Sequence, residues 1–110
     1  MSLFSQYIQE RTNKFVLEYE TGFGVYSYPN STTVYLEDIY VMPEYRKNGI
    51  ASIIANDIAT LAKDKGCNKM IGSVVPSAKN STSSLQVLLS YGMHLDSATN
   101  DYILFSKDLI

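Results

Sequence analysis

The segment that most constrains the fold of this 110-residue chain is a helical pattern enclosed between two strand-like runs. Residues 33–42 (TVYLEDIYVM) and 69–75 (KMIGSVV) are rich in β-branched and aromatic residues. Between them, apolar residues recur at helical spacing from Ile50 until Gly66, a glycine of the kind that ends helices. Two strands joined through a helix are expected to lie parallel as neighbours in one sheet.

The rest of the chain predicts further strands and helices around this unit. We expect helices over residues 3–11 and 81–91, and strands over residues 15–19, 24–28 and 102–106, with a shorter strand at 94–96. The two early strands form a hairpin across Glu20-Thr21-Gly22 and are therefore antiparallel. Because 110 residues supply one hydrophobic core, we expect a single domain, residues 1–110, with a mixed sheet and an α+β (mixed α/β) fold.

Charge and cysteine content exclude several functional classes. The chain has 9 Lys and Arg against 11 Asp and Glu, so it has no basic surplus for a nucleic-acid backbone. Its single cysteine, Cys67, has no partner for a disulfide and no neighbouring ligands for a metal site. No apolar run approaches the roughly 20 residues of a membrane span, and the N-terminus lacks a signal-peptide pattern. We expect a cytoplasmic protein without metal, nucleic acid or membrane as a partner.

Gly49 lies where the strand-like run 33–42 gives way to the helical pattern. The first four amides of a helix have no internal partner, and the helix dipole is positive at that end. Such a turn can hold a phosphate with main-chain donors, while Gly49 allows close approach and Ala51 adds little bulk. Taken alone, the spacing Arg46-x-x-Gly49-x-Ala51 fits an ordinary strand-to-helix turn equally well.

The wider run, residues 36–52 (LEDIYVMPEYRKNGIAS), resembles the acetyl-CoA-binding motif of the GNAT superfamily of N-acetyltransferases, Arg/Gln-x-x-Gly-x-Gly/Ala. Its Leu-Glu-Asp start is most similar to the diamine (spermidine/spermine-type) branch. Asn80, Ser84 and Tyr91-Gly92-Met93 resemble the second family motif, so the likeness covers residues 34–109. The resemblance implies the acyl-CoA N-acyltransferase fold, whose mixed, splayed, mainly antiparallel sheet is flanked by helices.

The resemblance also implies where acetyl-CoA would bind as the co-substrate. Backbone amides of the glycine turn would hold the CoA pyrophosphate, and that turn comprises Arg46, Lys47, Asn48, Gly49, Ile50, Ala51 and Ser52. The strand edge at Ile39, Tyr40 and Val41 would pair with the pantetheine arm like an added strand. Asn80 and Ser84 would lie near the far end of that arm.

The family reaction implied for the chain is direct attack of a primary amine, from a small molecule or peptide, on the thioester carbonyl. Glu37 is the first candidate base and Asp38 the second, and the amide hydrogen of Ile39 or Tyr40 would polarise the carbonyl. Adjacent side chains on a regular strand point to opposite faces, so only one carboxylate should face the reaction unless a bulge intervenes. Alternatively, both carboxylates face water, or the pair binds a cationic amine by charge.

The sequence departs from the family pattern in two respects. The usual proton donor is a Tyr four residues before the glycine of the second motif, and that position is Leu88 here. Tyr91 is then the candidate acid, with water as the alternative, or the chain is a catalytically silent acyl-CoA-binding or protein-interaction module. Family members also carry two helices between their first two strands, whereas only residues 2–13 precede the hairpin here. We therefore expect an acceptor side that is open, or completed by a second chain in a homodimer.

Overall fold

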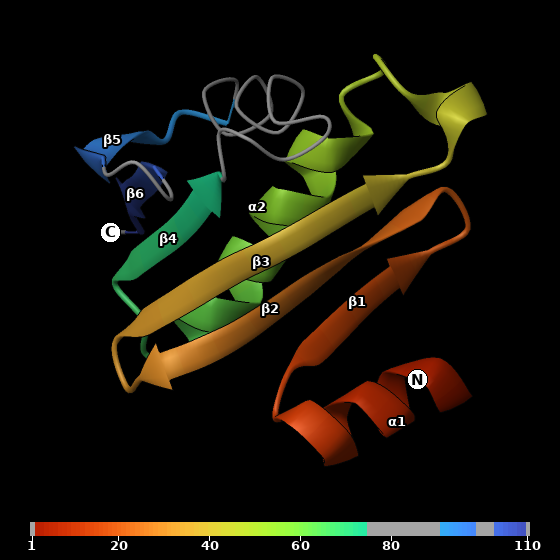
Figure 1. The fold of residues 1–110 in the computed structure, drawn as a ribbon, viewed down its shortest axis with the longest axis horizontal. Coiled ribbons are helices and arrows are strands. Elements are labelled where there is room, and N and C mark those ends of the chain that lie inside the picture. The colour runs from red at the N-terminus through yellow and green to blue at the C-terminus, as the bar shows by residue number, and fades with distance from the viewer. Residues whose placement is uncertain (1, 75–90, 99–102, 110) are drawn as a thin grey trace.

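The computed structural model describes residues 2–74, 91–98 and 103–109, whose strands form one twisted sheet (Figure 1). In chain order the elements are α1 (Leu3–Thr12), β1 (Phe15–Tyr19), β2 (Gly22–Asn30), β3 (Thr33–Val41), a 3-10 turn (Pro43–Tyr45), α2 (Ile50–Asp64), β4 (Lys69–Val74), β5 (His94–Ala98) and β6 (Ile103–Asp108). The strand order is β1-β2-β3-β4-β6-β5. Strands β3 and β4 are parallel and every other described pair is antiparallel, which confirms the expected mixed α+β fold.

The two helices lie on opposite faces of the sheet. Helix α2 packs mainly on β2 and β3, where Gly24 leaves room for the side chains of Ile54 and Ile58. Helix α1 approaches the opposite face, where the ring of Phe4 meets that of Phe23 edge-on. Figure 1 shows α2 behind the strands and α1 beside β1. We call the face opposite α2, which carries Phe23, Asp38 and Tyr40, the front face.

The core lies between α2 and the sheet. Its largest fully buried side chains are Ile54 and Ile58 from α2, Val34 from β3 and Met70 from β4. Burying a side chain of this size stabilises the fold by about 1.5–3 kcal/mol relative to leaving it exposed. The apolar spacing of α2 therefore holds the central strands in place, and with them the turn at its N-terminus.

Strands β3 and β4 separate after a short parallel pairing. The paired residues run from Thr33–Lys69 to Leu36–Gly72 in register. Beyond that point β3 continues to Val41 without pairing to β4, so the sheet opens between the two strands. The splay implied by the family resemblance is found at this position.

The observed bounds differ slightly from those predicted. Strand β2 begins at Gly22 rather than residue 24, because Gly22 pairs with both Tyr19 and Val41, and only residues 20–21 form the turn. It also extends through residues 29–30, and Asn30 turns the chain by accepting a hydrogen bond from the amide of Thr32. Of the predicted helix 81–91 the structure describes Tyr91 alone, which lies in a turn rather than a helix, and the start of the last strand at residue 102 lies outside the described residues. None of the described helices is long and apolar enough to cross a membrane.

Candidate functional site

The turn before α2 presents main-chain donors. Gly49 is the N-cap residue, with a left-handed φ of 77°, and no described side chain caps the helix there. The first helical hydrogen bond runs from the Ile53 amide to the Gly49 carbonyl, 3.1 Å away. The amides of Ile50, Ala51 and Ser52 therefore precede the helical ladder, at the positive end of the helix dipole.

The space around these donors is open. A Cβ built on Gly49 would meet no described atom within 4 Å. The Arg46 side chain does not enter this space: its Nε donates to the Val41 carbonyl at 2.8 Å, and its guanidinium lies 5.6 Å from the Tyr40 ring centroid. Asn48 donates back to the Tyr45 carbonyl, 3.4 Å away. The turn thus fits a pyrophosphate held by backbone amides, the group that Gly-containing helix starts bind well.

The far half of β3 has a free edge on the side of β4. Ile39, Tyr40 and Val41 pair with β2 on one side, at Gly24, Phe23 and Gly22. On the other side, no described strand pairs with β3 beyond Leu36. An edge of this kind can take up an extended chain through main-chain hydrogen bonds.

A β-bulge lies at Glu37. Val25 pairs with Asp38 and Tyr26 pairs with Leu36, so Glu37 is an extra residue on β3. The bulge shifts the alternation of the strand: Leu36 and Ile39 pack in the core, while Asp38 is exposed on the front face. Glu37 and Asp38 therefore both point away from the core. On a regular strand only one of the two would do so, and the bulge is the exception.

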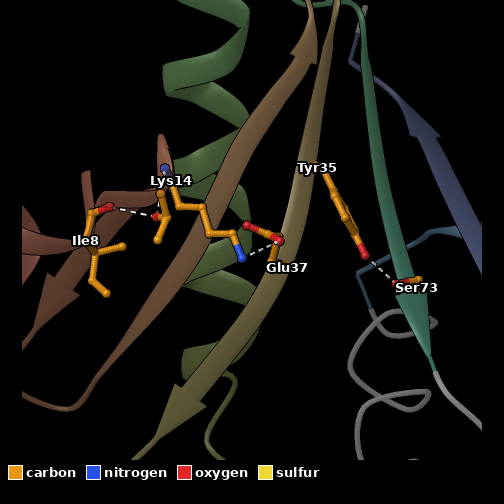
Figure 2. Close-up of polar contacts among 6 residues, drawn as sticks. Ile8, Lys14, Tyr35, Glu37 and Ser73 are labelled. Carbon is orange, nitrogen blue, oxygen red and sulfur yellow. Dashed lines mark hydrogen bonds and ion pairs between the residues drawn. The ribbon is translucent and has the colours of Figure 1, made fainter. Parts of the chain in front are cut away.

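Glu37 has one occupied and one unoccupied oxygen. Its Oε1 lies 3.2 Å from the Nζ of Lys14, and Figure 2 shows the lysine side chain reaching it in front of β2. Its Oε2 is buried and has no hydrogen-bond partner among the described residues. The carboxylate is 21% exposed, so it can exchange its lysine partner for another cation at the surface.

Tyr35 and Ser73 bridge the two strands where they begin to separate. The Tyr35 hydroxyl and the Ser73 Oγ are 2.6 Å apart, joining β3 to β4 at the end of their paired segment, whose last pair is Leu36–Gly72 (Figure 2). This hydrogen bond holds the base of the splay at a fixed width, close to Glu37.

Aromatic rings line the front face beside the carboxylates. Tyr40 stacks on Phe23 with 5.5 Å between ring centroids, and Phe4 meets Phe23 edge-on at 6.5 Å. Tyr40 remains 41% exposed. The front face beside the candidate bases therefore combines acidic groups from β3 with an apolar wall.

Tyr91 lies on the other side of the sheet. Its ring packs against the core below α2, and the Nζ of Lys107 lies 3.9 Å from the ring centroid. Burial raises the pKa of the Tyr91 phenol, and the negative charge of Asp57 raises it further. The structure therefore brings Glu37 and Asp38 together but does not bring Tyr91 beside them. Asn80, Ser84 and Leu88 lie outside the described residues.

Two of these contacts have no local signal in the sequence. Lys14 and Glu37 are 23 positions apart in the chain; Lys14 directly precedes β1, and β2 lies between β1 and the β3 strand of Glu37. Tyr35 and Ser73 belong to two strands that are joined through α2. Only the strand order brings them together. Within residues 2–74, 91–98 and 103–109, no group of three His, Cys, Asp or Glu is placed to bind a metal ion.

Comparisons with known proteins indicate one family and one fold. The model of the acetyltransferase (GNAT) family matches residues 3–84. Thialysine N-epsilon-acetyltransferase of Bos taurus is 49% identical over 53 residues, which are 44% of this chain and 31% of that protein. The chain therefore spans about a third of the length of this curated relative.

Two solved structures have the same fold at low sequence identity. A GNAT family acetyltransferase from Elizabethkingia anophelis, with acetyl-CoA bound, superposes with a TM-score of 0.72 and 17% identity, covering 94% of this chain and 82% of that one. Ard1 from Thermoplasma volcanium superposes with a TM-score of 0.74 and 13% identity, covering 96% and 77%.

Proposed function

The chain belongs to the GNAT family of acetyltransferases, and from this premise we propose that it transfers an acetyl group from acetyl-CoA to a primary amine of a small molecule or peptide. One observation carries the proposal. The free edge of β3 runs from the bulge at Glu37 to Val41, and the chain then passes through the 3-10 turn to the uncapped start of α2 at Gly49. A carboxylate therefore lies at the start of this edge, and an anion seat follows it in the chain. The named activity of the bovine relative and the acetyl-CoA bound to the Elizabethkingia enzyme support it.

Main-chain groups would hold the co-substrate. The amides of Ile50, Ala51 and Ser52, with the open approach at Gly49, would bind the pyrophosphate. The β3 edge from Ile39 to Val41 would pair with the pantetheine arm, which has amide groups to match. Acetyl-CoA supplies an activated acetyl group with a good leaving thiolate. Arg46, engaged with the Val41 carbonyl, would stiffen the turn rather than contact phosphate.

Glu37 would take the proton that an ammonium must lose before it can attack. Its Oε2 is buried, with no described partner, and its Oε1 already contacts an amine nitrogen, that of Lys14. Asp38 is exposed beside it and would attract a cationic acceptor by charge, or act as the second base. The aromatic wall of Phe23 and Tyr40 would pack on the carbon chain of the amine.

The proton for the departing thiolate would come from Tyr91 or from water. The raised pKa of Tyr91 keeps its phenol protonated at neutral pH, but its ring lies on the α2 side of the sheet. Replacing Tyr91 by Phe decides between the two donors: a large fall in kcat would identify the phenol, and an unchanged kcat would identify water.

The test of the proposed function begins with calorimetric titration of acetyl-CoA and continues with thiol release over a panel of amines. We expect binding, and release with at least one amine. Glu37→Gln should lower kcat by about 10²-fold or more, the usual contribution of a general base, while acetyl-CoA affinity stays unchanged. Asp64→Asn, at the exposed C-terminal end of α2, is the matched control and should retain full activity.

The outcomes separate the enzyme from its alternatives. Absence of acetyl-CoA binding would remove the co-substrate assignment. Binding without thiol release from any amine would instead identify the catalytically silent acyl-CoA-binding module. If Glu37→Gln and Asp38→Asn both leave turnover unchanged, neither residue is the base.

Assembly and location remain predictions. A homodimer that completes the acceptor side would be detected by light scattering coupled to gel filtration. A cytoplasmic location agrees with the one cysteine, Cys67, which is buried and whose pKa is raised by that burial, so it stays a thiol in a reducing compartment.

A further inference from the structure

Lys14 occupies a fixed corner of the chain between α1 and β1. The preceding residue, Asn13, ends α1 in a left-handed conformation with φ of 57°. The Lys14 amide donates to the Thr12 hydroxyl at 3.3 Å, and that hydroxyl donates to the Ile8 carbonyl at 2.6 Å (Figure 2). The main-chain amide of Lys14 is thus tied to the end of α1, and its side chain starts from a defined point.

From this corner the side chain crosses the front face and ends at the candidate base. Phe15 and Tyr26 stack on the α2 side of the sheet, so the adjacent Lys14 points to the other side, across β2. Its Nζ lies 3.2 Å from the Glu37 Oε1 and the side chain is 43% exposed. A primary amine belonging to the protein therefore sits where the acceptor amine of the reaction would give up its proton.

We propose that Lys14 is an internal acceptor: the chain acetylates its own Lys14 Nζ when acetyl-CoA is present. This inference rests on the proposed function, since it uses the same base and the same acetyl donor. Glu37 takes one proton from the Lys14 ammonium, the freed lone pair forms a C–N bond to the acetyl carbon, and the nitrogen then loses a second proton. The C–S bond breaks, its electron pair leaves with sulfur, and the sulfur takes up a proton. The lysine ammonium and acetyl-CoA give an acetylated lysine, the free thiol of CoA and one proton.

Other described lysines lack this arrangement. Lys65 lies over the Tyr28 ring at 4.4 Å from the centroid, and Lys107 lies over Tyr91. Lys69 is 3.8 Å from the Asp96 carboxylate, on the strands beyond the splay. Lys14 is the described lysine whose nitrogen contacts a carboxylate at the bulge of β3. Proximity of this kind raises the effective concentration of the amine at the reacting centre.

Acetylation would change the site that performs it. An acetylated Lys14 has no positive charge, so it can no longer form the ion pair with Glu37. The carboxylate would then be free for the ammonium of an external acceptor. Before modification, Lys14 competes with that acceptor for Glu37.

The experiment follows the purified full chain with acetyl-CoA by peptide mass spectrometry. We expect an addition of about 42 Da, one acetyl group in place of one hydrogen, on the peptide that contains Lys14, with a rate at least about tenfold above that of exposed Lys63. The rate constant should not depend on protein concentration, because the amine and the base belong to one chain. Glu37→Gln should lower it toward the rate of Lys63, and an added diamine should slow it by competition.

Matched variants give a second readout. Lys14→Arg keeps a positive charge near Glu37 but cannot be acetylated, so the mass increase should vanish while the unfolding midpoint stays unchanged. Lys63→Arg should leave modification of Lys14 intact. Lys14→Met should lower the KM for external amines several-fold, because the internal competitor is gone.

The outcomes also distinguish this inference from the proposed function. If external amines are acetylated but Lys14 is modified no faster than Lys63, or its rate is unaffected by Glu37→Gln, internal transfer is wrong and the proposed function stands. A rate that increases with protein concentration would show transfer between molecules and overturn internal transfer. If acetyl-CoA does not bind, both internal transfer and the proposed function are wrong.

Discussion

At the scale of single residues, the glycines at the two ends of α2 have the same backbone requirement but different roles. Gly49 has φ of 77° and Gly66 has φ of 103°, and a Cβ at either position would meet no described atom within 4 Å. Any other residue at these positions pays a backbone cost of roughly 1–2 kcal/mol. Only Gly49 lies at the helix end that presents free amides.

We predict that Gly49→Val removes measurable acetyl-CoA binding while the chain still folds. The branched side chain would fill the open space in which the pyrophosphate approaches the amides of α2. Gly66→Val is the matched control, because it imposes a similar backbone strain at the opposite end of the helix. Calorimetric titration should show normal affinity for the control; normal affinity for Gly49→Val would contradict the seat assigned to the pyrophosphate.

The residues of the candidate site differ in how far the sequence predicts them. The turn at Gly49 could be predicted because a strand pattern, a glycine and a helical pattern follow one another in the chain. The sequence allowed a bulge at Glu37 but did not predict one, because the residues Leu-Glu-Asp fit a regular strand as well. The ion pair of Glu37 with Lys14 could not be predicted, since it depends on which strand lies between them.

At the scale of elements, β2 needs glycines where α2 and β3 pack closely against it. A Cβ on Gly24 would lie 2.7 Å from the Ile58 Cδ1 and 2.8 Å from the Ile54 Cγ2, both on α2. A Cβ on Gly22 would instead collide with the main-chain carbonyl of Tyr40 on β3. The first obstacle consists of side-chain ends, whereas the second is backbone.

We predict that Gly22→Ala destabilises the fold more than Gly24→Ala. Overpacking a core contact costs about 1–3 kcal/mol, and Gly24→Ala should fall in this range because Ile54 and Ile58 can adjust by changing rotamer. Gly22→Ala must displace β3 itself, so it should also weaken acetyl-CoA binding at the adjoining edge. Urea unfolding of both variants gives the order, and equal losses would contradict it.

Most element bounds could be predicted, and the reason differs between helix and sheet. The period of α2 is carried by its own residues, so its start at Ile50 was predicted correctly. The start of β2 at Gly22 depends on pairing with Tyr19 and Val41, which are not its neighbours in sequence. Strand ends of this kind are decided by partners rather than by local propensity.

At the scale of the whole molecule, buried tyrosines couple stability to alkaline pH. Partial burial, together with the neighbouring Tyr26 and Cys67, raises the pKa of Tyr28 from the ordinary 10.0 to about 12. Burial also raises the pKa of Tyr26. The folded state thus holds these phenol protons more tightly than the unfolded chain does. Their stabilising contribution is complete below pH 10 and is lost as pH rises toward 12.

We predict that the urea midpoint falls between pH 10 and pH 12, and that it falls less in Tyr28→Phe, which has no proton to lose. Tyr7→Phe is the control, because this ring is 55% exposed on α1. The comparison is made as a slope of midpoint against pH, so that any loss of packing at neutral pH cancels. A slope in Tyr28→Phe equal to that of the unmodified chain would show that this phenol is not the coupled group.

The short parallel pairing of β3 with β4 makes this the position where the sheet opens most easily. Strands β1 to β3 and strands β4 to β6 share one core with α2, but between β3 and β4 the strand pairing is limited to four residue pairs, with one hydroxyl contact beside them. Opening a protein locally is easiest where the fewest bonds must break. Deuterium should therefore enter the amides of residues 33–36 sooner than those along β2, and a molecule wedged into the divergence would delay that entry.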